Sequence, residues 1–320
     1  MQIIRDLDSF KPDKSPHPRV MTAGVFDGVH RGHQGLIQRV REQAGADGTG
    51  IVFTFSNHPL SVLAPAYVPR FLMSHRRKLE IFEKMGVDLT IAPEFTTAFA
   101  DQSPERFIDK VLIGQFAIDK LIVGFDFRFG KDGLGTNQWL SEIARHKGFE
   151  VEILPPVFEE EWTISSTRIR EFVNDGRMKE AMKMLGRPYE LEGPVIHGFG
   201  RGRKLGFPTA NLDFDTKFAL PGSGVYAVFA ALPDTGDVYG GMMNVGSSPT
   251  FSGTEYRPEV FLFDYENGSL YDKTMRIYFI ERIREERKFP SADALVERIR
   301  VDEKLARAIL ENEKNRDLMI

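Results

Sequence analysis

Two histidines three residues apart, His30 and His33, are the residues of this chain best placed to do chemistry. They lie where a short apolar run of strand type, residues 20–23, turns into a segment whose apolar residues repeat at helical spacing. A helix start attracts anions through its amides and dipole, and Gly32 lets a phosphate approach the backbone closely. Residues i and i+3 share a helix face, so both imidazoles can stabilise charge that grows on one phosphorus atom. The alternatives are a structural pair or a zinc site, and zinc would find no cysteine here.

A glycine-rich basic segment, residues 198–206, is a second candidate for phosphate binding. Repeated glycines free backbone amides to wrap a polyphosphate, and the segment adds positive charge at Arg201, Arg203 and Lys204. Beyond it, Thr209 and Asn211 project to one side of an extended segment, where two oxygen ligands suit a hard cation. A solvated basic loop followed by turn residues is the alternative. The chain has no G-x-x-x-x-G-K-[ST] motif, which argues against a P-loop kinase.

A third cluster of phosphate-binding residue types begins at Ser165. A predicted helix start, capped by Ser166, offers the hydroxyls of Ser165, Ser166 and Thr167. The guanidinium groups of Arg168 and Arg170 can bind phosphate oxygens there. An ordinary helix cap with a charged face is the alternative.

The elements that must position these residues follow two different patterns. Up to residue 154, apolar strand candidates (residues 20–23, 51–55, 89–92, 121–123 and 151–154) alternate with helices, which predicts a doubly wound parallel sheet with ligands at the carboxyl ends of its strands. Beyond residue 188, strand candidates at 225–232, 238–245, 260–265 and 275–280 follow one another through short turns, which indicates a small antiparallel barrel. A helix over 291–313 closes the chain, with a predicted stripe of Leu295, Ile299, Leu305 and Ile309. We therefore expect a Rossmann-like α/β domain at 1–186 and a barrel domain at 187–320.

Composition limits the classes of function. A net charge of −4 gives no overall attraction to nucleic acid or anionic membranes, and no apolar run approaches a membrane span. The absence of cysteine excludes disulfides and fits a reducing compartment, so we expect a cytoplasmic protein. We expect small-molecule partners, with weak self-association at most.

Several motifs in a fixed order resemble one known family. The segment GVFDGVHRGH at 24–33 resembles the H-x-G-H signature of nucleotidylyltransferases, in the longer form found in prokaryotic bifunctional riboflavin kinase/FAD synthetases. Four further segments of this chain resemble the family's other motifs. They are FTFSNHP at 53–59, VGFDFRFG at 123–130, ISSTRIR at 164–170 and GFPTAN at 206–211. The resemblance covers nearly the whole chain. It implies phosphorylation of riboflavin to FMN by the C-terminal half and adenylylation of FMN to FAD by the N-terminal half, both with Mg-ATP.

The resemblance also implies roles for particular residues. At the adenylyl-transfer site, His30 and His33 would be catalytic. ATP would be bound by Gly24, Phe26, Gly32, Ser165, Ser166, Thr167 and Arg170, and flavin by His58, Asp126, Phe127 and Arg128. At the kinase site, Glu259 would be the catalytic carboxylate that accepts the proton of the riboflavin alcohol. ATP would be bound by Gly202, Lys204, Thr209 and Asn211, with Mg²⁺ on Thr209 and Asn211 and Arg284 near flavin or nucleotide.

The chain departs from the family pattern at four places. Val25 replaces a frequent asparagine, Ser56-Asn57 replaces an acidic residue and proline, Phe261 replaces a histidine, and Asp272 replaces a glycine. Three other functions compete with the main interpretation. They are an FMN adenylyltransferase whose C-terminal module binds flavin with little or no kinase activity, a different nucleotidylyltransferase, and a flavin-binding regulator without enzymatic activity.

Overall fold

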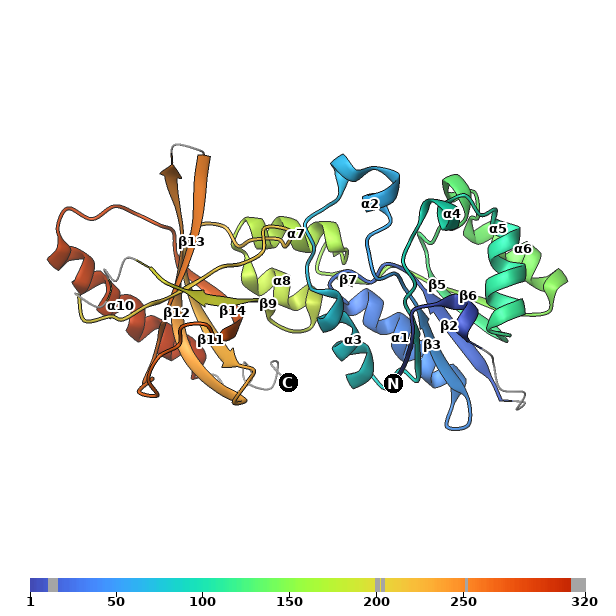
Figure 1. The fold of residues 1–320 in the computed structure, drawn as a ribbon, viewed down its shortest axis with the longest axis horizontal. Helices are drawn as coiled ribbons and strands as arrows, with labels where there is room; N and C mark the ends of the chain where they lie inside the picture. The colour runs from blue at the N-terminus through green and yellow to red at the C-terminus, as the bar shows by residue number, and fades with distance from the viewer. Residues whose placement is uncertain (11–16, 199–201, 203–204, 251–252, 312–320) are drawn as a thin grey trace. The chain divides into compact units, whose positions relative to one another are not determined.

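The computed structural model describes residues 1–10, 17–198, 202, 205–250 and 253–311. Contacts within the chain divide it into two compact units. The first unit comprises Met1–Pro69 and Ser74–Ile164, and the second comprises Arg70–Met73 and Ser165–Ile320. Figure 1 labels the elements of both units along the chain.

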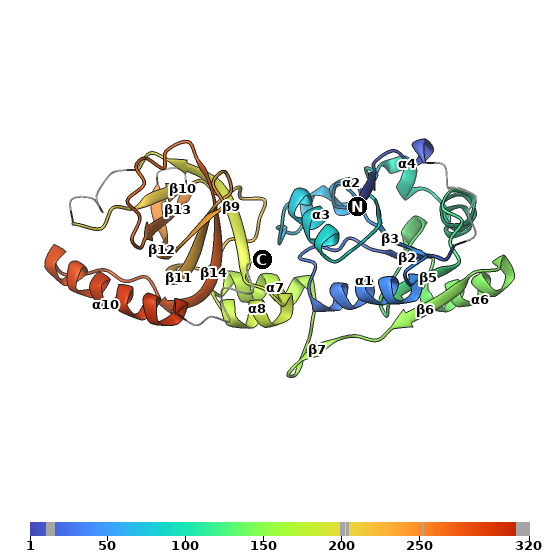
Figure 2. The ribbon, with the colours of Figure 1, turned by 90° about the horizontal axis from the view of Figure 1, so that it is seen from below.

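The first unit is built on a parallel sheet of six strands in the order β1-β4-β3-β2-β5-β6. All neighbouring strands pair in parallel, and β3, β2, β5 and β6 lie side by side in Figure 2. The chain moves outward from β2 in both directions, so the strand order reverses between β2 and β5. This arrangement confirms the doubly wound parallel sheet, and it places a ligand crevice at the carboxyl ends of β2 and β5. The strands are β1 (Gln2–Ile4), β2 (Arg19–Ala23), β3 (Thr49–Phe53), β4 (Leu89–Ile91), β5 (Lys120–Gly124) and β6 (Glu150–Leu154).

Helices cover both faces of this sheet. Met21 and Ala23 of β2 belong to a buried apolar cluster with the helices η3 and α6, while α1 buries Leu36, Ile37 and Val40. Because successive strand residues point to opposite faces, Val20 and Thr22 lie on the other side of the sheet from that cluster. The helices of this unit are η1 (Leu7–Ser9), α1 (Arg31–Ala44), α2 (Leu60–Leu63), η2 (Pro65–Tyr67), α3 (His75–Lys84), α4 (Thr97–Ala100), α5 (Pro104–Arg106), the π-helix η3 (Phe107–Gln115), η4 (Lys131–Gly133) and α6 (Asn137–Lys147). A two-stranded ribbon, β7 (Phe158–Glu159) and β8 (Trp162–Thr163), follows β6.

The second unit contains a closed barrel with the strand order β10-β13-β12-β11-β14-β9. Its neighbouring strands pair antiparallel, which confirms the predicted barrel. The strands are β9 (Tyr189–Ile196), β10 (Ala210–Leu212), β11 (Gly224–Leu232), β12 (Asp237–Thr250), β13 (Gly253–Leu262) and β14 (Thr274–Arg284). The helices α7 (Ser166–Asn174) and α8 (Met178–Leu185) precede the barrel, and α10 (Ala292–Leu310) closes it.

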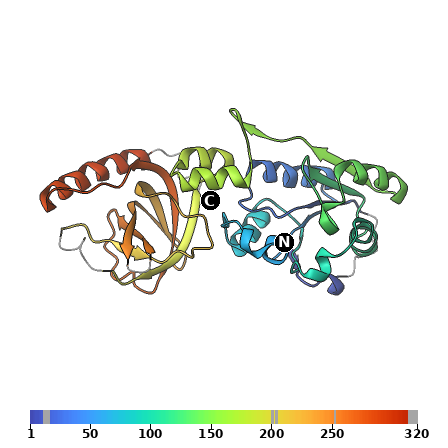
Figure 3. The same ribbon diagram turned by 90° about the horizontal axis from the view of Figure 1, so that it is seen from above.

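The helix α10, red in Figure 3, runs along the outside of the barrel. It packs on a cluster formed by outward-facing side chains of the strands, including Val225, Phe229 and Met242. The residues that α10 buries are Asp302, Ala306 and Leu310, whereas Leu305 is 45% exposed. The predicted stripe was therefore wrong at Leu305, and a buried carboxylate lies on the face that meets the barrel.

Local signals explain several helix ends, but five strands were not among the strand candidates. Gly148 and Gly186 end α6 and α8 in the left-handed conformation, and Ser103 caps the helix that begins at Pro104. Ser165, not Ser166, caps α7, because the Ser165 hydroxyl accepts from the Arg168 amide at 3.2 Å. The strands β1, β7, β8, β9 and β10 were not predicted from the sequence.

The two units separate at Ile164/Ser165, so that α7 and α8 group with the barrel. A domain boundary at residue 186 stays a prediction. In the part of the chain that the structure describes, no helix combines the length and apolar character needed to cross a membrane.

Candidate active sites

The corner between β2 and α1 holds the two histidines. His30 is the N-cap of α1, and its Nδ1 accepts a hydrogen bond from the His33 amide at 3.3 Å. The two imidazole rings stack, with centroids 3.6 Å apart and planes 16° from parallel. Because Nδ1 accepts, a neutral His30 ring carries its proton on Nε2, the atom that can then donate to a ligand. The helix begins at the residue after His30, so the rings lie at the dipolar end of α1 as predicted.

Close packing explains the other residues of this corner. A Cβ atom at Gly32 would lie 3.3 Å from the His30 ring, so glycine gives that ring its room. The Phe26 side chain is buried and meets the His33 ring edge-on at a centroid distance of 5.1 Å. Gly24, at the carboxyl end of β2, lies against the Phe26 ring, which a Cβ atom would approach to 3.2 Å. Phe26 thus supports His33 from behind, and an ATP contact by Phe26 or Gly24 stays a prediction.

The predicted flavin residues of this unit follow the neighbouring strands. His58 comes after β3, and its Nδ1 accepts from the Leu60 amide at 3.1 Å. Asp126 and Arg128 follow β5 and are exposed. Phe127 is half-buried, packs on the apolar cluster of the sheet and stacks on Phe129 at 5.4 Å. The topology brings His58 and Asp126 to the same edge of the sheet as His30, because all three follow carboxyl ends of parallel strands.

The predicted phosphate-binding residues of α7 group with the second unit. Ser165 caps the helix, and Ser166, Thr167 and Arg170 occupy its first turns. Arg170 donates from Nε to the Arg70 carbonyl at 2.6 Å. Their assignment to ATP stays a prediction.

A cavity of about 320 Å³ lies in the second unit on the outer face of the barrel strands, where α10 covers them. Glu259 and Phe261 of β13 line it together with Asn244 and Met242 of β12. The intervening Val260 and Met243 are fully buried and face the other way. Glu259 is therefore half-buried in a pocket, and its catalytic role stays a prediction.

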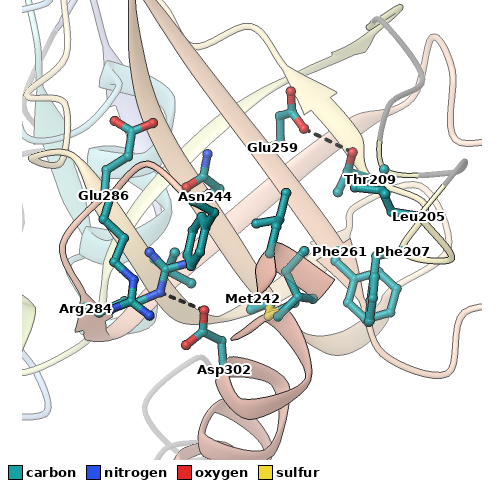
Figure 4. Close-up of a pocket in the computed structure, with 16 residues that line it drawn as sticks. Leu205, Phe207, Thr209, Met242, Asn244, Glu259, Phe261, Arg284, Glu286 and Asp302 are labelled. Carbon is teal, nitrogen blue, oxygen red and sulfur yellow. Dashed lines mark hydrogen bonds and ion pairs between the residues drawn. The ribbon is translucent and has the colours of Figure 1, made fainter. Parts of the chain in front are cut away.

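Polar groups gather at one end of this cavity. Thr209 donates from its hydroxyl to Glu259 Oε2 at 3.2 Å, as the dashed line in Figure 4 marks. Glu259 pairs across the sheet with Asn211 of β10 on one side and with Asn244 on the other. Directly paired residues of antiparallel strands project from the same face, so the amides flank the carboxylate. Hydroxyl, amide and carboxylate oxygens are the donor set that fits Mg²⁺.

The opposite end of the cavity carries an arginine held by a buried carboxylate. Arg284 donates from Nε to Asp302 Oδ2 at 2.7 Å, and Arg298 Nε lies 2.8 Å from Asp302 Oδ1. Asp302 is 1% exposed. In Figure 4 this pair lies across the cavity from Glu259 and Thr209, with Met242 and Phe261 in the middle and Phe207 beside Phe261. The cavity therefore offers an apolar middle with a proton acceptor at one end and a fixed cation at the other.

The glycine-rich segment is described only in part. Gly202 lines the cavity, and its assignment to ATP stays a prediction. Lys204, Arg201 and Arg203 lie outside the described residues. A Cβ atom at Gly198 would lie 2.0 Å from Asn211 Nδ2, so this glycine lets the strand pass close to Asn211.

Comparisons with known proteins match a family to each part of the chain. A family model described as FAD synthetase matches residues 13–168, and one described as riboflavin kinase matches residues 185–310. A Bacillus subtilis protein named bifunctional riboflavin kinase/FMN adenylyltransferase is 38% identical over 294 residues, covering 90% of this chain and 91% of its own. The chain belongs to this bifunctional family.

Further relatives in the family share most of their length with this chain. The Escherichia coli K12 protein of the same name is 34% identical, covering 96% of this chain and 97% of its own. A crystal structure described as a macrolide-efflux protein from Streptococcus pneumoniae superposes with a TM-score of 0.84 at 35% identity, covering 95% of this chain and 98% of its own. The chain thus carries both domains of a bifunctional riboflavin kinase/FMN adenylyltransferase.

Three residues of these sites escaped the sequence interpretation. Asn244 and Asp302 line the kinase cavity, and Lys78 is buried beneath the histidine corner. A charged residue on the apolar face of a predicted helix was the available signal for two of them. Lys78 lies one turn before Phe82, and Asp302 lies one turn before Ala306.

One family departure has a backbone consequence. Asp272 has a φ of 64°, in the region that glycine adopts without steric cost, which fits the glycine that the resemblance led us to expect there. Phe261, where the resemblance led us to expect a histidine, lines the cavity and meets Phe207 edge-on at 5.5 Å. It extends the apolar middle of the pocket.

Proposed function

We propose that this chain makes both FMN and FAD. In the barrel, the γ-phosphoryl group of ATP passes to the terminal alcohol of riboflavin. At the β2–α1 corner, the adenylyl group of a second ATP passes to the phosphate of FMN, and pyrophosphate leaves. Membership of the bifunctional family and the contrasting chemistry of the two sites support this assignment.

In the kinase reaction, Glu259 orients the riboflavin alcohol and accepts its proton during transfer. The Thr209 hydroxyl holds one oxygen of this carboxylate at 3.2 Å, which fixes its direction. The apolar middle of the cavity would take the flavin ring, and Arg284 would contact its polar edge. Thr209 and Asn211 would hold Mg²⁺, which when bound neutralises charge on the phosphate oxygens of ATP.

In the adenylyl transfer, no carboxylate is needed to activate the acceptor, because the FMN phosphate already carries anionic oxygens. His30 and His33 donate to the α-phosphate and stabilise the charge that grows there. Alignment of the two phosphates then supplies most of the remaining acceleration. His58, Asp126 and Arg128 would orient the flavin.

The observation that carries the proposal is the hydrogen bond between Thr209 and Glu259 at the polar end of an apolar cavity, because a module that only holds flavin has no use for a positioned base. The test is to incubate the full chain with riboflavin and Mg-ATP and to follow four products. We expect FMN and ADP first, then FAD and pyrophosphate. FAD formation from supplied FMN, without phosphorylation of riboflavin, would support the alternative of an inactive barrel. Because both reactions consume ATP, we also propose the cytoplasm as the location.

A further inference from the structure

Lys78 is a buried lysine directly beneath the histidine corner. It lies on α3 and is 7% exposed. Its Nζ donates to the Val25 carbonyl at 3.1 Å, to the Thr54 hydroxyl at 3.0 Å and to the Phe55 carbonyl at 3.1 Å. An ammonium group has three N–H donors, so each donor has an acceptor.

The three acceptors belong to the two segments that carry predicted site residues. Val25 lies in the corner between β2 and His30, and Thr54 and Phe55 lie between β3 and His58. Thr54 also donates to the Val25 carbonyl at 3.2 Å, which closes the network. One ammonium group therefore fastens α3 to the carboxyl ends of two neighbouring strands, at the edge where the reaction is proposed to occur.

The corner that Lys78 holds contains backbone strain. Phe26 has a φ of 54° and Val29 has a φ of 36°, and a β-branched residue rarely adopts a positive φ. Such conformations persist only where the surrounding structure determines them. Lys78 binds the carbonyl of Val25, the residue immediately before Phe26, and so helps to keep the backbone in this conformation.

We propose that Lys78 is a positioning residue for adenylyl transfer, which keeps the corner in the conformation that aims His30 and His33 at the phosphate. The inference rests on the proposed function of this corner. A buried charge is a costly way to stabilise a fold, because apolar side chains of similar size can fill the same space at no desolvation cost. Its value here is the simultaneous fixing of three oxygen atoms.

The charged groups around Lys78 give the proposal a pH signature. Burial lowers the pKa of Lys78 to about 8, and the Asp27 carboxylate of the corner acts in the opposite direction. On α3, burial lowers the pKa of His75 to about 4, with smaller effects of Lys78 and Arg5, so His75 is neutral across the working range. The β3 segment faces Lys78 with a hydroxyl and a carbonyl. As pH rises through about 8, Lys78 loses a proton and one of its three donors.

The first test replaces Lys78 by methionine in the full chain, with formation of FAD and pyrophosphate from FMN and Mg-ATP as the assay. We expect Lys78→Met to lower kcat by about 100-fold, with both KM values within about threefold, because misplacing reacting groups by about 1 Å costs this much. The matched control is Lys84→Met, the same change at an exposed position of the same helix, which we expect to leave kcat unchanged. Riboflavin phosphorylation serves as the internal control and should not change in either variant.

The second test uses Thr54→Val, which keeps the lysine and the shape of the buried side chain but removes one acceptor. We expect kcat for FAD formation to fall about 3- to 10-fold, and its alkaline decline to move to lower pH, because a lost acceptor no longer favours the charged amine. If Lys78 served only to stabilise the fold, Thr54→Val would not shift the pH at which kcat declines. This variant also decides the question if Lys78→Met does not fold.

Either of two results would overturn the inference. The first is a wild-type kcat in folded Lys78→Met or, if that variant does not fold, in Thr54→Val. The second is a decline of kcat at alkaline pH that occurs at the same pH in Thr54→Val as in the wild-type chain. A wild-type chain that forms no FAD from FMN would instead overturn the proposed function of the corner.

Discussion

The histidine corner and the barrel cavity handle phosphate by different constructions. The corner is local, since His30 and His33 come from one decapeptide and are set by a single strand-to-helix transition. The cavity is assembled from β11, β12, β13, β14, α10 and the segment before β10, which lie far apart along the chain. The two histidines are therefore set by the conformation of a short segment, which Lys78 of α3 supports, whereas the cavity depends on the register of a whole barrel.

The two sites also differ in their charged groups, and the proposed acceptors explain the difference. The phosphate of FMN is already a nucleophile, so its site needs donors that neutralise charge. The alcohol of riboflavin is neutral, so its site needs a carboxylate that accepts a proton. We therefore expect that loss of a histidine of the corner abolishes only FAD formation, and that loss of Glu259 abolishes only riboflavin phosphorylation.

The largest expected effect separates the sites at the barrel. Glu259→Gln keeps the shape of the side chain but removes the proton acceptor, so riboflavin phosphorylation should fall by about 10²- to 10⁴-fold. FAD formation from supplied FMN should be unchanged. Glu266→Gln, at an exposed turn of the same unit, is the matched control. Chromatography of the flavins measures both activities, and loss of both from this one change in a folded protein would contradict two separable sites.

The reverse experiment concerns the corner. His33→Ala removes one donor to the α-phosphate, and we expect FAD formation to fall by about 10²- to 10³-fold while FMN formation is spared. His146→Ala, an exposed histidine on α6, should leave both activities at wild-type level. Initial rates of pyrophosphate and ADP release distinguish the two reactions. Equal loss of both products would show that the comparison between the sites is wrong.

A smaller effect is expected where α10 meets the barrel. Asp302→Asn replaces the carboxylate that holds Arg284 and Arg298, so KM for riboflavin should rise by about 10-fold with less change in kcat. The barrel should also lose about 2 kcal/mol of unfolding free energy, because a buried charge pair loses one partner. Asp293→Asn on the exposed start of the same helix is the control. Steady-state kinetics and thermal unfolding test this together, and an unchanged KM would exclude Arg284 from flavin binding through this pair.

The smallest expected effect concerns backbone conformation alone. Asp272→Gly should stabilise the barrel by about 0.5 kcal/mol, because Asp272 holds a φ of 64° that glycine adopts freely. Asp234→Gly, in another exposed turn but without a positive φ, should instead destabilise by a similar amount. Denaturant unfolding measures both free energies. Changes of the same sign in the two variants would contradict this account of residue 272.

The sequence by itself determined the two classes of fold and the location of the histidine corner. Alternating strands and helices indicated the parallel sheet, and consecutive strands with short turns indicated the barrel. His30 and His33 were recognisable because their geometry depends on neighbours within a single strand-to-helix turn, which local spacing encodes.

Only the tertiary structure decided which distant residues share a site. The pairing of Glu259 with Asn211 and Asn244 depends on strand register, and Asp302 reaches Arg284 because α10 packs on the outer face of the barrel. The strands β1, β9 and β10 escaped prediction because pairing with other strands, not their own composition, makes them strands. By its residue type alone, Lys78 resembles an exposed lysine. Only the fold buries its ammonium group and places it among three oxygen atoms. Spacing along the chain encodes contacts within a turn or two, whereas contacts between distant segments arise only when the whole fold closes around them.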